Sequence, residues 1–107
     1  MGVNKYGNKR TNGFDSIKEF NRYQELKLLE RAGKISGLST QVPFDLIPKQ
    51  YDDNGKFLFH GITYVADFTY WKDGQYIVED CKGFKTKEYQ LKKKMLYYFR
   101  HIKIKES

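Results

Sequence analysis

Cysteine, proline and long apolar runs are all scarce in this chain of 107 residues. The one cysteine, Cys81, cannot form an internal disulfide, and His60 and His101 are too far apart in the sequence for a zinc-binding pattern. No apolar segment approaches the roughly 18 residues that a membrane-spanning helix requires. These absences argue against a disulfide-stabilised domain, a zinc finger and a helical membrane protein, and they favour a reducing, cytoplasmic environment.

The chain divides by composition into a short arm and a longer domain. Residues 1–13 are rich in Gly, Asn and Lys and poor in aliphatic side chains, which is typical of a flexible arm that becomes ordered against a partner. Residues 14–107 are long enough for one hydrophobic core but too short for two. We therefore expect a flexible basic arm followed by a single domain.

Positive charge is concentrated near the two ends of the chain. The formal net charge is +7, and between residues 85 and 105 eight basic residues accompany a single acid, Glu88. Such clusters favour binding to a polyanion such as nucleic acid, although a charged surface can also serve solubility alone. The residues that we expect to contact DNA are Lys5, Lys9, Arg10, Lys85, Lys87, Lys93, Lys94, Tyr97 and Arg100.

Two segments have the pattern of amphipathic helices. Ser16 and Glu19 have the spacing of a capping box, and the helix that they start would end at Gly33. Thr86 can cap a second helix. The residues predicted to face inward are Ile17, Phe20, Tyr23 and Leu26 or Leu29 in the first helix, and Leu91, Met95 and Tyr98 or Phe99 in the second.

Three strands are expected between these helices and one after them. Residues 38–51 are extended because Pro43 and Pro48 exclude a helix, while residues 62–71 and 75–82 are rich in β-branched and aromatic side chains. Asn54-Gly55 is a strong hairpin turn, and residues 101–106 alternate isoleucine with lysine, as a half-buried strand does. This order predicts a mixed α/β (α+β) fold, αβββαβ, with a central mixed four-stranded sheet flanked by helices.

The Asp73-Gly74 turn determines which side chains face each other on the two strands that it joins. If these two residues form the loop, Asp67 lies directly opposite Asp80. Their Cβ atoms would be about 5 Å apart on one face of the sheet, which Lys82 shares, while Glu79 points to the other face. A three-residue loop with a bulge would shift this pairing by one residue.

Two carboxylates at this separation repel each other by about 3 kcal/mol at an effective dielectric constant of about 20. A marginally stable domain would retain the pair only with positive charge beside it. Lys82 can supply that charge if Asp67 and Asp80 lie at a solvated edge of the sheet. A divalent cation such as Mg²⁺ fits an oxygen-rich pair better, and the apolar neighbours of both acids indicate a buried strand.

Asp67, the twelve residues after it and Asp80-Cys81-Lys82 resemble the signature of the PD-(D/E)XK nuclease superfamily. Ala66 stands where that signature usually has proline. The order helix, three strands, helix, strand is also the restriction-endonuclease-like core of that superfamily. The segments NKYGNKR, FDSIKEFNRYQELKLLERAGKI, ITYVADF and VEDCKGFKT resemble a family of small phage-encoded nuclease-like proteins related to its resolvase-type members.

This resemblance implies a site for Mg²⁺ or Mn²⁺ held by Asp67, Asp80 and the backbone carbonyl of Cys81. Lys82 would orient or help deprotonate the attacking water and offset phosphate charge. In resolvase-like members a glutamate of the first helix joins the metal ligands, and Glu19 stands at the matching place. The catalytic residues implied are therefore Glu19, Asp67, Asp80 and Lys82, with the capping box as the alternative role of Glu19.

Three further residues are expected near this site. Gln41 and Thr86 could flank it, and Lys87 opens the second helix, whose amino-terminal end attracts phosphate through its free N–H groups. Glu79 is left out of the site, because it would point to the opposite face.

The function that the resemblance implies is hydrolysis of phosphodiester bonds in DNA by a metal-dependent endonuclease. Branched DNA such as a Holliday junction is the expected substrate, in phage replication or recombination, and a homodimer would place two sites for paired cuts. The alternative is a basic DNA-binding module that keeps the fold and has no catalytic activity. A third hypothesis, a small RNA-binding protein without nuclease ancestry, leaves the paired aspartates unexplained.

Overall fold

The computed structural model describes residues 16–107, so the predicted arm, residues 1–13, lies outside the described part of the chain. Its elements are α1 (Ile17–Arg31), β1 (Ser36–Ile47), β2 (Gln50–Tyr51), β3 (Phe57–Phe59), β4 (Ile62–Lys72), β5 (Gln75–Asp80), α2 (Lys87–Arg100) and β6 (Lys105–Glu106). One sheet has the strand order β1-β4-β5-β6, in which β6 alone runs parallel to its neighbour. The expected mixed four-stranded sheet flanked by two helices is confirmed.

Both helices begin where the sequence predicts. The Ser16 hydroxyl accepts the N–H of Glu19 at 3.1 Å, and the Thr86 hydroxyl accepts the N–H of Tyr89 at 3.0 Å. Each bond satisfies one of the free N–H groups in a first helical turn. The first helix ends before Gly33, whose φ of +77° lies in the left-handed region that favours glycine.

The inward faces of the helices agree in part with the prediction, because Leu26 is buried and Tyr23 and Leu29 pack against the same core. In α1, Ile17 is 55% exposed, because the first turn presents Glu19 to the sheet and Ile17 points away from that side. In α2, Tyr89 and Leu96 are buried, two turns apart, and of the predicted stripe only Met95 packs against the core. The predicted residues Leu91, Tyr98 and Phe99 are exposed. The helix carries apolar residues on several of its sides, so its periodicity was compatible with more than one inward stripe.

The hairpin between β4 and β5 has the predicted register. Asp73 and Gly74 both have positive φ, 52° and 77°, which is the geometry of a two-residue type I′ turn. The ladder runs from Lys72 opposite Gln75 to Phe68 opposite Glu79. The next position along it places Asp67 opposite Asp80.

Two cores lie on the sheet, one beneath each helix. Tyr64 and Ala66 of β4 belong to the core with α2, whereas Phe68 and Tyr70 of the same strand belong to the core with α1. The strand therefore passes from one core to the other at Asp67. This position gives a buried carboxylate neighbours from both layers of the protein.

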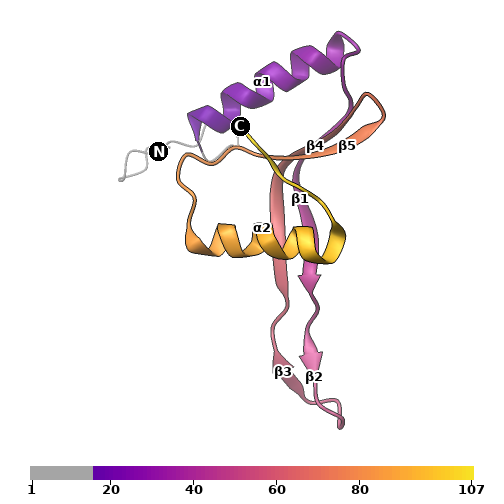
Figure 1. Ribbon diagram of the computed structural model, residues 1–107, viewed down its shortest axis with the longest axis vertical. Helices are drawn as coiled ribbons and strands as arrows, with labels where there is room; N and C mark the ends of the chain where they lie inside the picture. Colours follow the sequence, from indigo (N-terminus) through magenta and orange to yellow (C-terminus); the bar gives the residue numbers. More distant parts are fainter. Residues whose placement is uncertain (1–15) are drawn as a thin grey trace, which may run out of the picture.

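Beyond the sheet, β1 and β4 continue into a thin two-stranded ribbon formed by β2 and β3 (Figure 1). We call residues 48–61 the ribbon arm. Its tip is the predicted Asn54-Gly55 turn, where the Asp52 carboxylate accepts the N–H groups of Asn54 and Lys56 at 2.9 Å each. The sequence predicted the turn but not the projection of the arm away from the helices.

Neither helix of residues 16–107 is long and apolar enough to cross a membrane.

Candidate metal and catalytic site

Asp67 and Asp80 lie where strands β4 and β5 separate. After the last ladder pair, β5 ends at Asp80 and the chain turns toward α2, whereas β4 continues beside β1. An Asp67 carboxylate oxygen accepts the N–H of Cys81 at 2.8 Å, across the point of separation. Asp67 is 7% exposed and Asp80 is fully buried, on two interior strands. The alternative of a solvated sheet edge is therefore wrong.

The carboxylate of Asp80 is only partly compensated. The Tyr64 hydroxyl donates a hydrogen bond to Oδ2, and the Lys82 ammonium lies 3.5 Å from Oδ1. This ion pair does not have the geometry of a hydrogen bond, so Oδ1 is a buried oxygen without a hydrogen-bond partner. A buried acceptor in this condition is costly, and it marks the place where a cation would stabilise the protein.

The electrostatics of Asp80 lead to the same inference. Burial raises its pKa to about 6, and the neighbouring Asp67 carboxylate adds to the rise. The hydrogen bond from Tyr64 and the charge of Lys82 favour the ionised form but do not outweigh burial. Negative charge is therefore in excess at this point of the protein.

Lys82 connects the buried pair to solvent. Its side chain is 37% exposed, and its ammonium lies 5.7 Å from the centre of the Tyr89 ring, within the range of a cation–π contact. Its amine is thus shared between a carboxylate, an aromatic face and water. It can reach a substrate without leaving Asp80.

The Glu19 carboxylate is engaged by an unusual residue of β1. Gln41 donates a 3.0 Å hydrogen bond from Nε2 to the Glu19 carboxylate. Gln41 has a φ of 53°, in the left-handed region that glutamine rarely adopts, and its place in the register is opposite Asp67. Such backbone strain is concentrated at functional positions. Gln41, expected to flank the site, thus orients a second expected residue.

The structure shows the Ser16 half of the predicted capping box. The cap uses its backbone N–H, which Ser16 accepts, whereas its carboxylate is engaged by Gln41. Within residues 16–107 no three side chains of His, Cys, Asp or Glu form a group that could hold a metal ion. The Ser16 cap is confirmed, whereas the capping-box role and the metal-binding role of the Glu19 carboxylate both stay predictions.

The residues present fit a hard divalent cation with an incomplete protein shell. Asp67 and Asp80 supply carboxylate oxygens, and one of those oxygens is buried and unbonded. The Cys81 side chain packs in the core beneath α1, so a contribution from this residue would come from its backbone carbonyl. Magnesium commonly takes one or two carboxylates and completes its shell with water and substrate phosphate.

A cavity of about 280 Å³ opens beside this pair. Tyr64 and Lys82, which both contact Asp80, line it together with Thr86, the cap of α2. Lys92 lines it as well and forms a 3.0 Å ion pair with Glu88 on the same helix. The amino-terminal end of α2 and two lysines therefore border this cavity, which Glu88 lines as well. The helix end and the lysines attract anions.

Glu79 lies on the opposite face, as the register predicts, in a network of its own. Arg22 donates to both of its oxygens, at 2.6 and 3.1 Å, and Tyr70 and Ser107 donate as well. Burial raises the pKa of Glu79, but these hydrogen bonds outweigh burial and hold it below its ordinary value. This carboxylate is fully compensated, in contrast to Asp80.

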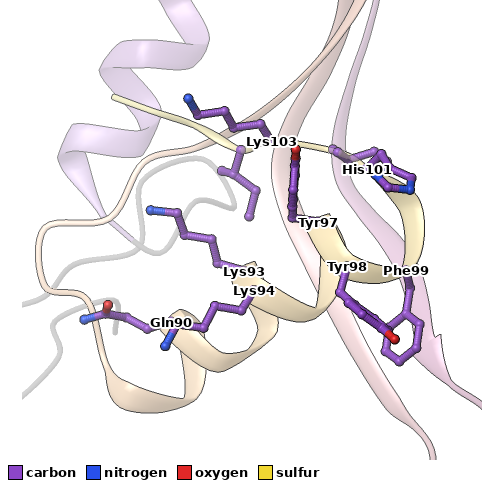
Figure 2. Close-up of a pocket in the computed structure, with 10 residues that line it drawn as sticks. Gln90, Lys93, Lys94, Tyr97, Tyr98, Phe99, His101 and Lys103 are labelled. Atoms are coloured by element: carbon purple, nitrogen blue, oxygen red, sulfur yellow. The ribbon is translucent and has the colours of Figure 1, made fainter.

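The residues predicted to contact DNA do not form one surface. Lys93, Lys94 and Tyr97 line an open groove of about 1050 Å³ on α2, where Figure 2 shows Lys93 and Lys103 extending to the same side of Tyr97. Arg100 instead donates to the backbone carbonyl of Asp45 at 2.9 Å, toward β1.

The other predicted DNA contacts lie elsewhere. Lys87 is the first residue of α2, and Lys85 precedes it near the cavity. Lys5, Lys9 and Arg10 lie outside the described residues.

Two residues of the site were not found by sequence reasoning. Tyr64 is three positions before Asp67, so strand alternation places the two on opposite faces, yet its hydroxyl reaches Asp80. Tyr89 belongs to α2 but was not in the predicted inward stripe. No local signal identifies either residue, because both reach the site only through the packing of α2 on the separated strands.

A family model described as "Protein of unknown function (DUF1064)" matches residues 3–107, and the chain belongs to this family. No curated protein and no solved structure matches the chain.

Proposed function

We propose that this member of the DUF1064 family is a metal-dependent DNA endonuclease. One observation supports the proposal above all others. Two buried carboxylates lie side by side, one oxygen of Asp80 has no hydrogen-bond partner, and Lys82 lies 3.5 Å from that oxygen at the edge of an open cavity. Two carboxylates can hold a divalent cation that polarises a phosphodiester, and a lysine beside them can offset phosphate charge.

Asp67, Asp80 and the Cys81 carbonyl would hold Mg²⁺ or Mn²⁺, with Glu19 as a further candidate ligand. The ion would polarise the scissile phosphate and lower the pKa of a bound water. Only hard oxygen donors are required, and the two carboxylates provide them.

The surrounding residues have separate tasks. Tyr64 donates a hydrogen bond to Oδ2 of Asp80, so that Oδ1 would remain available to a cation. Lys82 carries a positive charge that can offset the developing charge on the phosphate and orient the attacking water. Gln41 keeps the Glu19 carboxylate beside the strand position of Asp67.

The charge around the cavity suits a DNA backbone. Lys85, Lys87 and Lys92 accompany the amino-terminal end of α2, and the chain as a whole carries a net charge of +7. Lys93, Lys94 and Tyr97 would extend this contact along α2, because cations beside an aromatic ring bind nucleic acid strands. We propose branched DNA as the substrate and the host cytoplasm as the place of action, by analogy with resolvase-type nucleases.

Cleavage assays test the proposal. Linear, single-stranded and four-way-junction DNA are incubated with the protein in Mg²⁺, Mn²⁺ or EDTA, beside the variants Asp80→Asn and Lys82→Ala. The matched controls are Asp73→Asn and Lys72→Ala, which change exposed side chains away from the cavity. Both site variants should lose cleavage and both controls should retain it. Cleavage that survives Asp80→Asn and Lys82→Ala would remove this site from the mechanism.

The second candidate function is a DNA-binding module without catalytic activity. It is favoured by the finding that no three metal-binding side chains are grouped within residues 16–107. In that case DNA binding persists in EDTA, and no substrate is cut with either metal.

A further inference from the structure

The ribbon arm exposes several large apolar side chains over a short stretch of the chain. Tyr51, Phe57, Leu58 and Phe59 are 55%, 42%, 48% and 60% exposed, within ten consecutive residues. The arm projects from the sheet on the side away from α1, and α2 does not cover it (Figure 1). Exposed apolar groups gathered in this way commonly mark an interaction surface.

The internal contacts of the arm are few. The rings of Tyr51 and Phe57 lie 5.9 Å apart, and those of Phe57 and His60 lie 4.9 Å apart. Among the described residues, neither hydrophobic core includes a side chain of the arm. An isolated two-stranded ribbon is at best marginally stable in water, so burial against a partner would stabilise it.

The charge of the arm indicates which partner fits. Lys49 and Lys56 balance Asp52 and Asp53, so the arm is formally neutral while the whole chain carries +7. A nucleic acid would bind the rest of the molecule in preference to a neutral arm with acids at its tip. Two copies of the chain repel each other through their excess charge, and the arm is a surface where they can meet without that repulsion.

The charges are also arranged in a self-complementary way. The tip carries Asp53 beside the turn, and the base of the arm carries Lys49; both side chains are exposed. If two arms lie antiparallel, the tip of each meets the base of the other. A two-fold contact requires this property, because the same patch must fit itself.

We propose that the ribbon arm is a self-association surface, on which a second copy of this chain packs its own arm antiparallel about a two-fold axis. The apolar side chains meet in the middle, and Asp53 of each copy pairs with Lys49 of the other. Two short arms bury less than a standard interface, so the dimer is reversible, with a dissociation constant on the order of micromolar. The proposal does not depend on nuclease activity.

Sedimentation equilibrium in EDTA and without DNA tests this surface. The wild-type chain should pass from monomer to dimer as its concentration rises. Phe59→Lys should weaken the dimer at least about tenfold, because each dimer loses two buried rings. The control is Leu28→Lys, which places the same charge at a side chain of α1 that is 61% exposed. Circular dichroism verifies that each variant is folded.

A charge exchange tests the antiparallel arrangement. Asp53→Lys alone and Lys49→Asp alone place like charges opposite each other, so each variant should dimerise less than the wild type. Mixing the two variants restores both opposite-charge pairs and should restore the dimer.

Three results would overturn the proposal. The first is a wild-type chain that stays monomeric throughout the concentration series, and the second is a dimer that Phe59→Lys leaves unchanged. The third is a mixture of the charge variants that dimerises no better than either alone. If Phe59→Lys weakens DNA binding without changing the oligomeric state, the arm is a nucleic-acid contact instead.

Discussion

Replacement of Asp80 by asparagine should stabilise the protein while it removes cleavage. Asn has nearly the shape of Asp and cannot ionise, and its amide oxygen can still accept the hydrogen bond from Tyr64. The carboxylate that it replaces is fully buried, next to Asp67, and has one oxygen without a hydrogen-bond partner. The substitution therefore removes a charge that folding forces out of water.

The magnitude follows from the pKa of Asp80. A carboxyl group with a pKa of 3.8 in the unfolded chain and about 6 in the folded protein binds its proton more tightly when folded. The free energy of unfolding therefore falls as pH rises from about 4 to about 6, by about 3 kcal/mol, and then stays level. Asp80→Asn should recover most of this loss at pH 7, which corresponds to roughly 10 °C in melting temperature for a domain of this size.

The measurement is urea denaturation in EDTA at a series of pH values between 4 and 8. The quantity to compare is the difference in the free energy of unfolding between variant and wild type. Glu79, which has a lowered pKa, gives both proteins the opposite pH dependence, with stability lost as pH falls, and this contribution cancels in the difference. Asp73→Asn, at an exposed turn position that accepts either residue, is the control and should show no such difference.

Added Mg²⁺ provides a second comparison. It should stabilise the wild type at pH 7 and leave Asp80→Asn nearly unchanged, because binding to the folded state alone raises the free energy of unfolding. If the variant and the wild type have the same free energy of unfolding at every pH, burial of the ionised Asp80 carboxylate does not destabilise the protein. The inference of a cation site would then have no support.

Three further substitutions test the surroundings of the site. Arg22→Ala leaves the buried Glu79 carboxylate without its cation and should cost about 3–5 kcal/mol in urea denaturation; a loss below about 1 kcal/mol would show that the network is dispensable. Tyr64→Phe removes the hydrogen bond that favours ionised Asp80, so the acid limb of the pH–rate profile for cleavage should move to higher pH, and an unchanged profile would contradict the contact. Glu19→Gln should reduce metal-dependent cleavage without lowering the melting temperature, because the helix cap uses its backbone N–H; an equal loss of both would make Glu19 a structural residue only.

The hairpin register illustrates how much of the site the sequence could predict. The conformation of Asp73-Gly74 is local, and a two-residue turn leaves only one pairing of the strands that it joins. From this turn alone, Asp67 and Asp80 were placed together and Glu79 was placed on the other face. The helix caps at Ser16 and Thr86 were predictable for the same reason, because each is settled within one helical turn.

The inward faces of the helices were less predictable. α2 carries apolar residues on several of its sides, so its periodicity allowed several inward stripes. Packing against the sheet buries Tyr89 and Leu96. The partner of Glu79 was also hidden, because Arg22 is 57 residues away in the chain and meets it only through the docking of α1.

The sequence by itself determined the order of the elements, their caps and turns, and the pairing of Asp67 with Asp80, because these depend on interactions between near neighbours in the chain. Only the tertiary structure decided that both acids are buried, that Tyr64 reaches Asp80, and that the ribbon arm stands free of the cores. The environment of the two acids depends on how far β4 and β5 stay paired before they separate. That point is set by helices packing from both sides of the sheet, where many weak contacts between distant residues act together.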